Sequence, residues 1–283
     1  MPLADPPLAD PAPDERVDGA EAHGAEHEAF EVIAGDPESS VILLGDHATN
    51  IVPPDYPPTL GLPADEFERH IAYDIGVRGI VHELAERLGA RAVLSRFSRL
   101  LIDPNRGDTD PTLIMRLSDG AVVPANHPLP PGERERRIER FWRPYDEAVG
   151  RAIEGKIARG IVPLIVSIHS FTPFWRGVPR PWQVGVLWDA DDRAPRPMID
   201  VLRADASLTV GDNEPYSGAL GGDMLNRHAH ARGVPHALIE VRQDLIGTRD
   251  GERAWAERLA PIIARIDGMD GIHAVRHYRS NAL

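Results

Sequence analysis

The chain contains no cysteine and only one lysine, Lys156. The lack of cysteine excludes disulfide bonds, thiolate metal ligands and a cysteine nucleophile, and it is typical of proteins from reducing compartments. The N-terminal residues lack the basic start and apolar core of a signal peptide, so we expect a cytoplasmic protein. No apolar run is long enough to cross a bilayer, so we expect no membrane partner.

Positive charge is also scarce, and the formal net charge of the 283 residues is −13. Binding to the phosphates of a nucleic acid requires a basic face, so this balance argues against a nucleic-acid partner. A small anionic ligand can still be bound by a few well-placed arginines. Because nearly all basic residues are arginines, each such role must be argued from position in the chain and not from frequency.

The first residues of the chain are rich in proline, alanine and acidic residues, and they contain the segment PLADP twice. Such a composition buries too little apolar area to offset the entropy lost on ordering, so we expect a mobile extension over residues 1–29. The whole chain is 42% hydrophobic and 27% charged, as in ordinary globular proteins. We therefore expect residues 30–283 to form a single α/β domain.

Apolar runs alternate with amphipathic segments after the extension. The apolar runs predict strands at 41–45, 92–103, 161–168, 183–189, 207–213 and 236–241. The amphipathic segments predict helices at 67–88, 134–160, 197–204, 222–232 and 252–266. Gly89 should end the first helix, and Pro144 should kink the second. This order predicts a three-layer α/β/α sandwich around a mixed, mostly parallel sheet, and the irregular stretch 104–131 should cover a site.

Three of the predicted strands end in or carry residues that can bind a metal. His47 and His169 each follow an apolar run, and Glu240 lies within the last one. Ligands of open α/β sheets bind at the carboxyl ends of the strands, so these side chains should meet. Two imidazoles, an oxygen ligand and a nearby carboxylate are the components of a catalytic zinc site with an open position.

Each of these residues also has a structural explanation. A histidine after a strand more often caps a loop than binds a metal. A buried carboxylate is costly unless it is paired or used, and Glu240 could pair with Arg242, which lies on the same face of the strand. Asp74 lies four residues after His70, so on a helix the two could face one site and supply an oxygen ligand or its partner. A solvated helix face is the alternative.

The segment RLLIDPNR, residues 99–106, gathers polar side chains after a predicted strand. Arginine binds carboxylates through a planar fork and asparagine adds directional hydrogen bonds, so Asn105 and Arg106 could hold a substrate carboxylate. A salt-bridged turn closed by Pro104 explains the segment equally well. Ser170 and Arg242 should lie near a bound ligand too, with a structural role as the alternative for both.

Five motifs in this order, GDHATNIVP, RHIAYDIG, SRLLIDPNR, SIHSFTP and HALIEVRQDL, resemble the N-formylglutamate amidohydrolase family. The resemblance extends over residues 30–266. It implies the fold of zinc carboxypeptidases and aspartoacylases. It also implies that His47 and His169 are zinc ligands and that Glu240 is the general base or acid.

The resemblance further implies that Asn105 and Arg106 hold the substrate carboxylate and that Arg99 could polarise the scissile carbonyl. One position departs from the carboxypeptidase-like pattern, which has a glutamate three residues after the first histidine where this chain has Asn50. A neutral amide is a poor zinc ligand, so we expect Asp74 to be the third ligand. Weaker metal binding and a loss of hydrolysis are the alternatives.

The expected function is zinc-dependent hydrolysis of the N-formyl or N-acyl amide of a small carboxylated substrate, such as an N-formyl amino acid. A carboxypeptidase-like peptidase is a second hypothesis. A non-catalytic protein that binds a small ligand on the same scaffold is a third, and the metal content of the protein should distinguish it from the other two.

Overall fold

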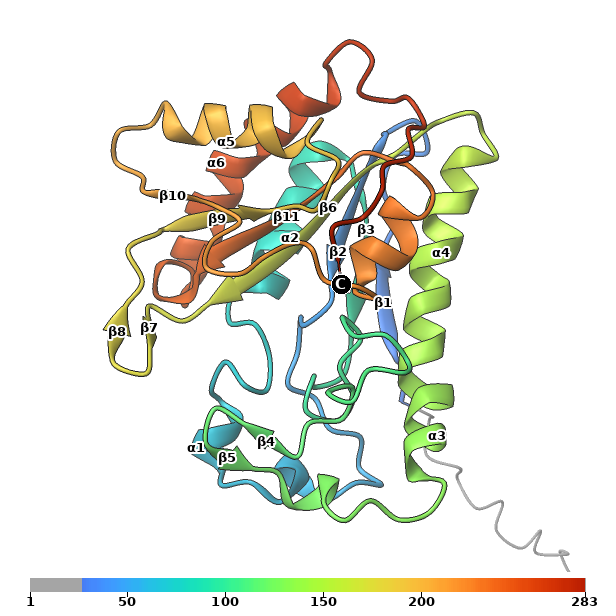
Figure 1. Ribbon diagram of the computed structural model, residues 1–283, viewed down its shortest axis with the longest axis vertical. Coiled ribbons are helices and arrows are strands. Elements are labelled where there is room, and N and C mark those ends of the chain that lie inside the picture. The colour runs from blue at the N-terminus through green and yellow to red at the C-terminus, as the bar shows by residue number, and fades with distance from the viewer. Residues whose placement is uncertain (1–26, 283) are drawn as a thin grey trace, which may run out of the picture.

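A seven-stranded mixed sheet lies between two layers of helices in the computed structural model, which describes residues 27–282 (Figure 1). The strands are, in the order of the sheet, β1 (Phe30–Ile33), β3 (Arg91–Ser95), β2 (Val41–Gly45), β6 (Leu164–Phe171), β11 (His236–Arg242), β9 (Val184–Leu187) and β10 (Val210–Asp212). Strands β3, β2, β6 and β11 are parallel to one another, whereas β1 is antiparallel to β3 and β9 is antiparallel to β11. The predicted mixed, mostly parallel sheet is therefore confirmed.

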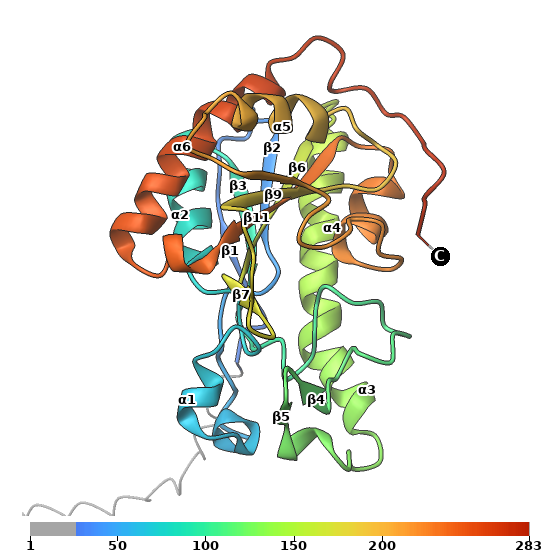
Figure 2. The ribbon, with the colours of Figure 1, turned by 60° about the vertical axis from the view of Figure 1, so that its left-hand side comes forward.

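Helices cover both faces of this sheet, as Figure 2 shows with the sheet between α2 and α4. One layer contains α2 (Val77–Leu88), α5 (Pro195–Arg203) and α6 (Arg249–Asp267). The other contains α3 (Glu133–Arg137), α4 (Arg143–Ile157) and the π-helical turns Ile138–Trp142 and Asn226–His230. None of the helices in residues 27–282 is long and apolar enough to span a membrane.

The inner strand β2 shows why the apolar runs that predict strands in this sequence are continuous and do not alternate with polar residues. Its residues Val41–Gly45 are all buried. Leu43 packs in the apolar cluster on the α2 and α6 side, whereas Leu44 packs in the cluster on the α4 side. A strand that is covered on both faces needs apolar side chains at successive positions, so its sequence reads as an unbroken apolar run.

The predicted helix 67–88 is wrong in its first half. The chain forms the short helix α1 (Ala64–Phe67), then turns, and α2 begins only at Val77. Gly76 has a left-handed φ of 82°, and the backbone N–H of Asp74 donates to the carbonyl oxygen of His47 at 2.9 Å. This tertiary hydrogen bond holds the turn segment against the end of β2. The tertiary contact thus outweighs the helical propensity of residues 68–76. Gly89 ends α2 in the left-handed region, as predicted.

Other predicted elements are shorter or interrupted. The strand expected at 92–103 ends at Ser95, because Ser98 turns away to bond the carbonyl oxygen of Ile51 at 2.8 Å. The long helix expected at 134–160 contains a π-helical turn directly before Pro144, which lies in the first turn of α4 and lacks the N–H that an α-helix needs. The remaining short elements are η1 (Pro58–Gly61), η2 (Pro124–Asn126), η5 (Gln243–Leu245), the hairpin of β4 (Leu117–Ser118) and β5 (Ala121–Val122), and the hairpin of β7 (Phe174–Trp175) and β8 (Val178–Pro179).

The mobile extension expected at residues 1–29 lies outside the described residues, apart from its last three. Of these three, Ala29 is buried against the core. Strand β1 begins at Phe30, and the domain boundary expected there stays a prediction.

A pair of glycine substitutions tests whether the turn before α2 depends on its left-handed residue. In Gly76→Ala, the new Cβ would lie 2.2 Å from the carbonyl oxygen of Ile246, whereas at Gly160, which has a φ of 80°, a Cβ meets nothing within 4 Å. We expect Gly160→Ala to lower the free energy of unfolding by about 1 kcal/mol from backbone strain, and Gly76→Ala by about 3 kcal/mol or more. Urea denaturation measures both, and equal losses would contradict the packing role of Gly76.

Candidate metal centre and active-site pocket

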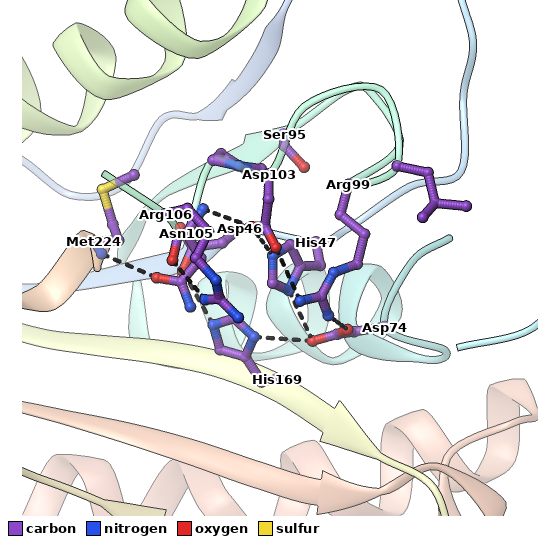
Figure 3. A network of polar contacts seen from close by, with 12 residues as sticks. Asp46, His47, Asp74, Ser95, Arg99, Asp103, Asn105, Arg106, His169 and Met224 are labelled. Carbon is purple, nitrogen blue, oxygen red and sulfur yellow. Dashed lines mark hydrogen bonds and ion pairs between the residues drawn. The ribbon is translucent and has the colours of Figure 1, made fainter. Parts of the chain in front are cut away.

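Polar side chains converge at the carboxyl ends of β2, β6 and β11, which are adjacent strands of the sheet (Figure 3). His47 follows β2, and His169 lies near the end of β6. Glu240 is the register partner of His169 on β11. Asp74 enters from the turn segment before α2. The structure thus brings the two histidines and two carboxyl groups to one edge of the sheet.

The carboxylate of Asp74 lies between the two imidazole rings. Its Oδ2 atom is 2.9 Å from Nδ1 of His169 and 3.3 Å from Nδ1 of His47. All three residues are buried, and their candidate ligand atoms lie within 4.8 Å of one another. The group His47, Asp74 and His169 could therefore hold a metal ion.

The Nε2 atom of each ring contacts a further buried carboxylate, which is a different one for each histidine. Nε2 of His47 lies 2.7 Å from Oδ1 of Asp103, and Nε2 of His169 lies 3.1 Å from Oδ2 of Asp46. Each ring therefore faces Asp74 with Nδ1 and a separate carboxylate with Nε2. In metal sites, a carboxylate on the outer nitrogen fixes the tautomer and orientation of a ligating histidine.

Opposite charges keep this buried cluster ionised. Arg99 donates to Asp74 Oδ1 at 3.2 Å and to Asp103 Oδ2 at 3.0 Å. Burial would raise the pKa of Asp74 and of Asp103, but the charges of His47 and Arg99 outweigh it and hold both values well below the usual range. Burial would lower the pKa of His169, but its hydrogen bonds to the carboxylates hold that pKa well above the usual value.

Glu240 has different surroundings. Its side chain is 6% exposed, and burial, with the charge of Asp74 adding to it, raises its pKa to about 8. Within residues 27–282 its Oε2 atom has no hydrogen-bond partner, and the Oγ atom of Ser170 also has none. A buried polar atom without a partner in a pocket indicates a place where a ligand binds.

A pocket of about 750 Å³ opens above these groups. Eight of the residues predicted for the site line it: His47, Asp74, Arg99, Asn105, Arg106, His169, Ser170 and Glu240. The predicted irregular stretch 104–131 also contributes Met115, Leu117, Ser118 and Asp119 to the lining. This volume is in the range of sites that enclose a small organic ligand.

The expectation for Arg242 is not met. Arg242 does not line the pocket, and its guanidinium pairs with Asp244 at 2.8 Å and not with Glu240. It also donates to the carbonyl oxygens of Arg180 and Trp182. Because β11 ends at Arg242, the following turn brings Asp244 within reach and draws the arginine away from the pocket.

Asn105 and Arg106 both present donors to the pocket. The side-chain oxygen of Asn105 accepts from the backbone N–H of Met224 at 2.9 Å, which leaves its Nδ2 group for a ligand. Arg106 donates to the carbonyl oxygen of Asn105, and no carboxylate of the described chain lies within 4.0 Å of its guanidinium. Asn50 donates to the carbonyl oxygen of Phe67 and is not part of the metal-binding group.

Sequence reasoning missed some residues of the site. Asp46 directly precedes His47 in the sequence, and this was the signal that could have indicated its role. Asp103 lies in the segment RLLIDPNR with no histidine nearby, so its contact with His47 could not be predicted from the sequence. Trp175 and Tyr216 also line the pocket. They come from a hairpin and a loop that carry no periodic pattern, so the sequence offered no signal for them.

Comparisons with known proteins relate this chain to a family and to solved structures. A sequence model described as N-formylglutamate amidohydrolase matches residues 39–247. An N-formylglutamate deformylase of Pseudomonas putida is 34% identical over 84 residues, which span 26% of this chain and 32% of that protein. The crystal structure of a gene product of Agrobacterium tumefaciens is 34% identical, covers 86% of this chain and 96% of that one, and superposes with a TM-score of 0.81.

A more distant crystal structure, of N-formylglutamate amidohydrolase from Ralstonia eutropha, shares the fold. It is 22% identical, covers 85% of this chain and 97% of that one, and has a TM-score of 0.61.

Metal binding by the three-residue group can be measured directly. We expect protein purified without chelator to hold about one divalent ion per chain, and His169→Ala to weaken its binding at least about 100-fold because one of three ligands is lost. Elemental analysis and competition with a chromogenic chelator measure both quantities. His82→Ala removes a half-exposed histidine that pairs with Glu31, and it should keep the ion. A metal-free wild type would contradict the assignment.

The two outer carboxylates should tune the same affinity. We expect Asp103→Asn and Asp46→Asn each to weaken metal binding by about 10- to 100-fold, because each ring loses the charge that orients it. Asp146→Asn is the matched control, since Asp146 lies 2.7 Å from Nε2 of His228 but outside the pocket. Chelator competition would argue against the orienting role if all three variants bound metal as the wild type does.

Proposed function

Because the chain belongs to the N-formylglutamate amidohydrolase family, and because its pocket joins a metal-binding group to a buried carboxyl, we propose that it is a zinc-dependent amidohydrolase. Its substrate is the N-formyl or N-acyl amide of a small molecule that carries a carboxylate, such as an N-formyl amino acid. The observation that carries this proposal is Glu240, a buried carboxyl with an unsatisfied oxygen beside the group His47, Asp74 and His169.

The donor set fits zinc. Two imidazole nitrogens and one carboxylate oxygen are a common set for catalytic zinc, and they leave a coordination position open. When bound, the ion would supply a Lewis acid that polarises the amide carbonyl and activates water. The carboxylates Asp46 and Asp103 would keep both rings in the orientation that binding requires.

Glu240 is the residue we assign to proton transfer. It would take a proton from the attacking water and deliver it to the leaving amine nitrogen. A general base works best when its pKa is near the working pH, and burial has already moved the pKa of Glu240 to about 8.

Three further residues would position the substrate. Arg106 and Asn105 would bind its carboxylate through a guanidinium that has no carboxylate of the described chain within 4.0 Å and through an amide Nδ2 group. Arg99, held by Asp74 and Asp103, would stabilise negative charge on the carbonyl oxygen. Their contribution is orientation and charge, since the bond changes occur at the amide and at Glu240.

The hypothesis of a non-catalytic binding protein rested on Asn50. Because Asp74 completes the group with the two histidines, the neutral residue at position 50 does not remove a ligand from it. Among residues 27–282, no contact in the pocket favours the peptidase hypothesis over hydrolysis of a small amide. The cytoplasmic location stays a prediction.

Replacing the proposed proton-transfer group tests the mechanism. We expect Glu240→Gln to lower kcat for N-formyl amino acids by about 10²- to 10⁴-fold, because the amide cannot accept the proton of water. Its zinc content should stay at the wild-type level, since Glu240 is not in the metal-binding group. The control is Glu154→Gln, which changes an exposed glutamate paired with Arg232. Wild-type turnover in Glu240→Gln would refute the role.

A further inference from the structure

The outer part of the pocket indicates which carboxylated amide it accepts. We propose that the substrate carries a single carboxylate beside a large apolar group, and that a second carboxylate is disfavoured. This inference rests on the proposed amide hydrolysis and names the substrate class of that same site. The apolar group can belong to the amino-acid side chain or to the acyl chain, because either would extend from the amide into the outer pocket.

The number of arginines available in the pocket limits how many substrate carboxylates it can bind. Three arginines line the pocket: Arg69, Arg99 and Arg106. Arg69 is paired with Glu66 and Asp119, and Arg99 is paired with Asp74 and Asp103. Among the described residues, Arg106 is the one of these three with no carboxylate within 4.0 Å, although its charge also acts on Asp103 from farther away. The lining therefore offers one guanidinium without a direct ion pair, which is sufficient for one carboxylate.

Negative charge around the pocket opposes a second carboxylate. Glu68 and Asp119 lie in the lining on the side of the β4–β5 hairpin, and Asp223 lines the pocket elsewhere. Among the described residues, Glu68 accepts hydrogen bonds only from the neutral donors of Asn50 and Tyr73. A second substrate carboxylate would thus be desolvated beside acidic groups, where the cation Arg69 is already paired with Glu66 and Asp119, and this is unfavourable.

An apolar wall forms part of the remaining lining, which also contains His70, Ser118, Thr172, Ser217 and Gln243. Its side chains come from separate segments and are Ile71, Ile75, Met115, Leu117, Trp175, Leu187, Tyr216, Leu220 and Leu238. Several of them are exposed, with Leu117 61%, Trp175 44%, Tyr216 38% and Leu220 37% accessible. Apolar side chains that line a pocket and are exposed there gain free energy when an apolar ligand group covers them.

Arg180 supports this wall, and its charge acts on the carboxyl of Glu240. Its guanidinium carbon lies 5.3 Å from the centre of the Trp175 ring and 5.0 Å from that of Tyr216, and one nitrogen donates to the Tyr216 hydroxyl at 3.1 Å. It also lies 5.7 Å from the ring of Phe171, is 9% exposed and does not line the pocket. The planar face of the Arg180 guanidinium therefore stacks on these rings and holds Trp175 and Tyr216 in place.

A comparison of substrates tests the selectivity. Rates of amide cleavage would be measured for N-formyl-L-phenylalanine, N-phenylacetylglycine, N-formyl-L-glutamate and N-formylglycine. We expect at least one of the two aromatic compounds to exceed N-formyl-L-glutamate about tenfold or more in kcat/KM. The better of the two identifies whether the amino-acid or the acyl side carries the apolar group. A preference for N-formyl-L-glutamate would overturn the inference and leave the proposed hydrolysis standing.

Two neighbouring residues of one hairpin supply matched variants. Trp175 lines the pocket, whereas Phe174 is 59% exposed and does not. We expect Trp175→Ala to lower the kcat/KM ratio of the preferred aromatic substrate to N-formylglycine about tenfold. Phe174→Ala should leave this ratio within about twofold. An unchanged ratio in Trp175→Ala, or an equal loss in both variants, would overturn the role of the wall.

A binding measurement separates this inference from the proposed function. If no amide is cleaved, calorimetry with the wild-type protein still compares N-formyl-L-phenylalanine and N-phenylacetylglycine with N-formyl-L-glutamate. Tighter binding of either aromatic compound, weakened in Trp175→Ala, would support the selectivity while the hydrolase proposal fails. Equal or weaker binding of both would overturn the selectivity.

Discussion

The carboxylate of Asp74 is the interaction on which the arrangement of the site depends. Its Oδ2 atom lies within hydrogen-bond distance of Nδ1 of both His47 and His169 and accepts from the backbone N–H of Ser170, while Oδ1 accepts from Arg99. A carboxylate that is 1% exposed would be strongly destabilising without such partners. The same contacts that stabilise its charge also set the relative positions of the two rings, so one buried group defines the geometry of the candidate metal centre.

The sheet makes this geometry possible because β2, β6 and β11 are consecutive and parallel. Their carboxyl ends therefore lie side by side, and the register places Glu240 directly beside His169. Asp74 comes from outside the sheet, and its backbone N–H bonds the carbonyl oxygen of His47. The turn segment is thus attached to the strand end by its main chain as well as by its side chain, which explains why residues 68–76 do not continue as a helix.

The strand ends could be predicted from the sequence, because strands buried on both faces appear as continuous apolar runs and the residues after them stand out. This reasoning led to His47, His169 and Glu240, which the structure brings together. It did not reveal that Arg242 would pair with Asp244, since that contact depends on the turn after β11. Spacing along a predicted helix also placed Asp74 near the site for the wrong reason, because the segment is a turn whose conformation depends on Gly76 and on tertiary hydrogen bonds.

The two hairpins at the pocket illustrate a different limit. Each has a two-residue turn with positive φ at both positions, Asp119-Gly120 and Arg176-Gly177. Their strands are only two residues long, so no alternation could reveal them. These hairpins nevertheless supply Leu117 and Trp175 to the apolar wall. In the proposed function the reaction would therefore depend on buried strand ends, whereas in the proposed selectivity the choice of substrate would depend on exposed loops. Since loops tolerate change without loss of the core, membership of the family constrains the reaction more strongly than it constrains the substrate.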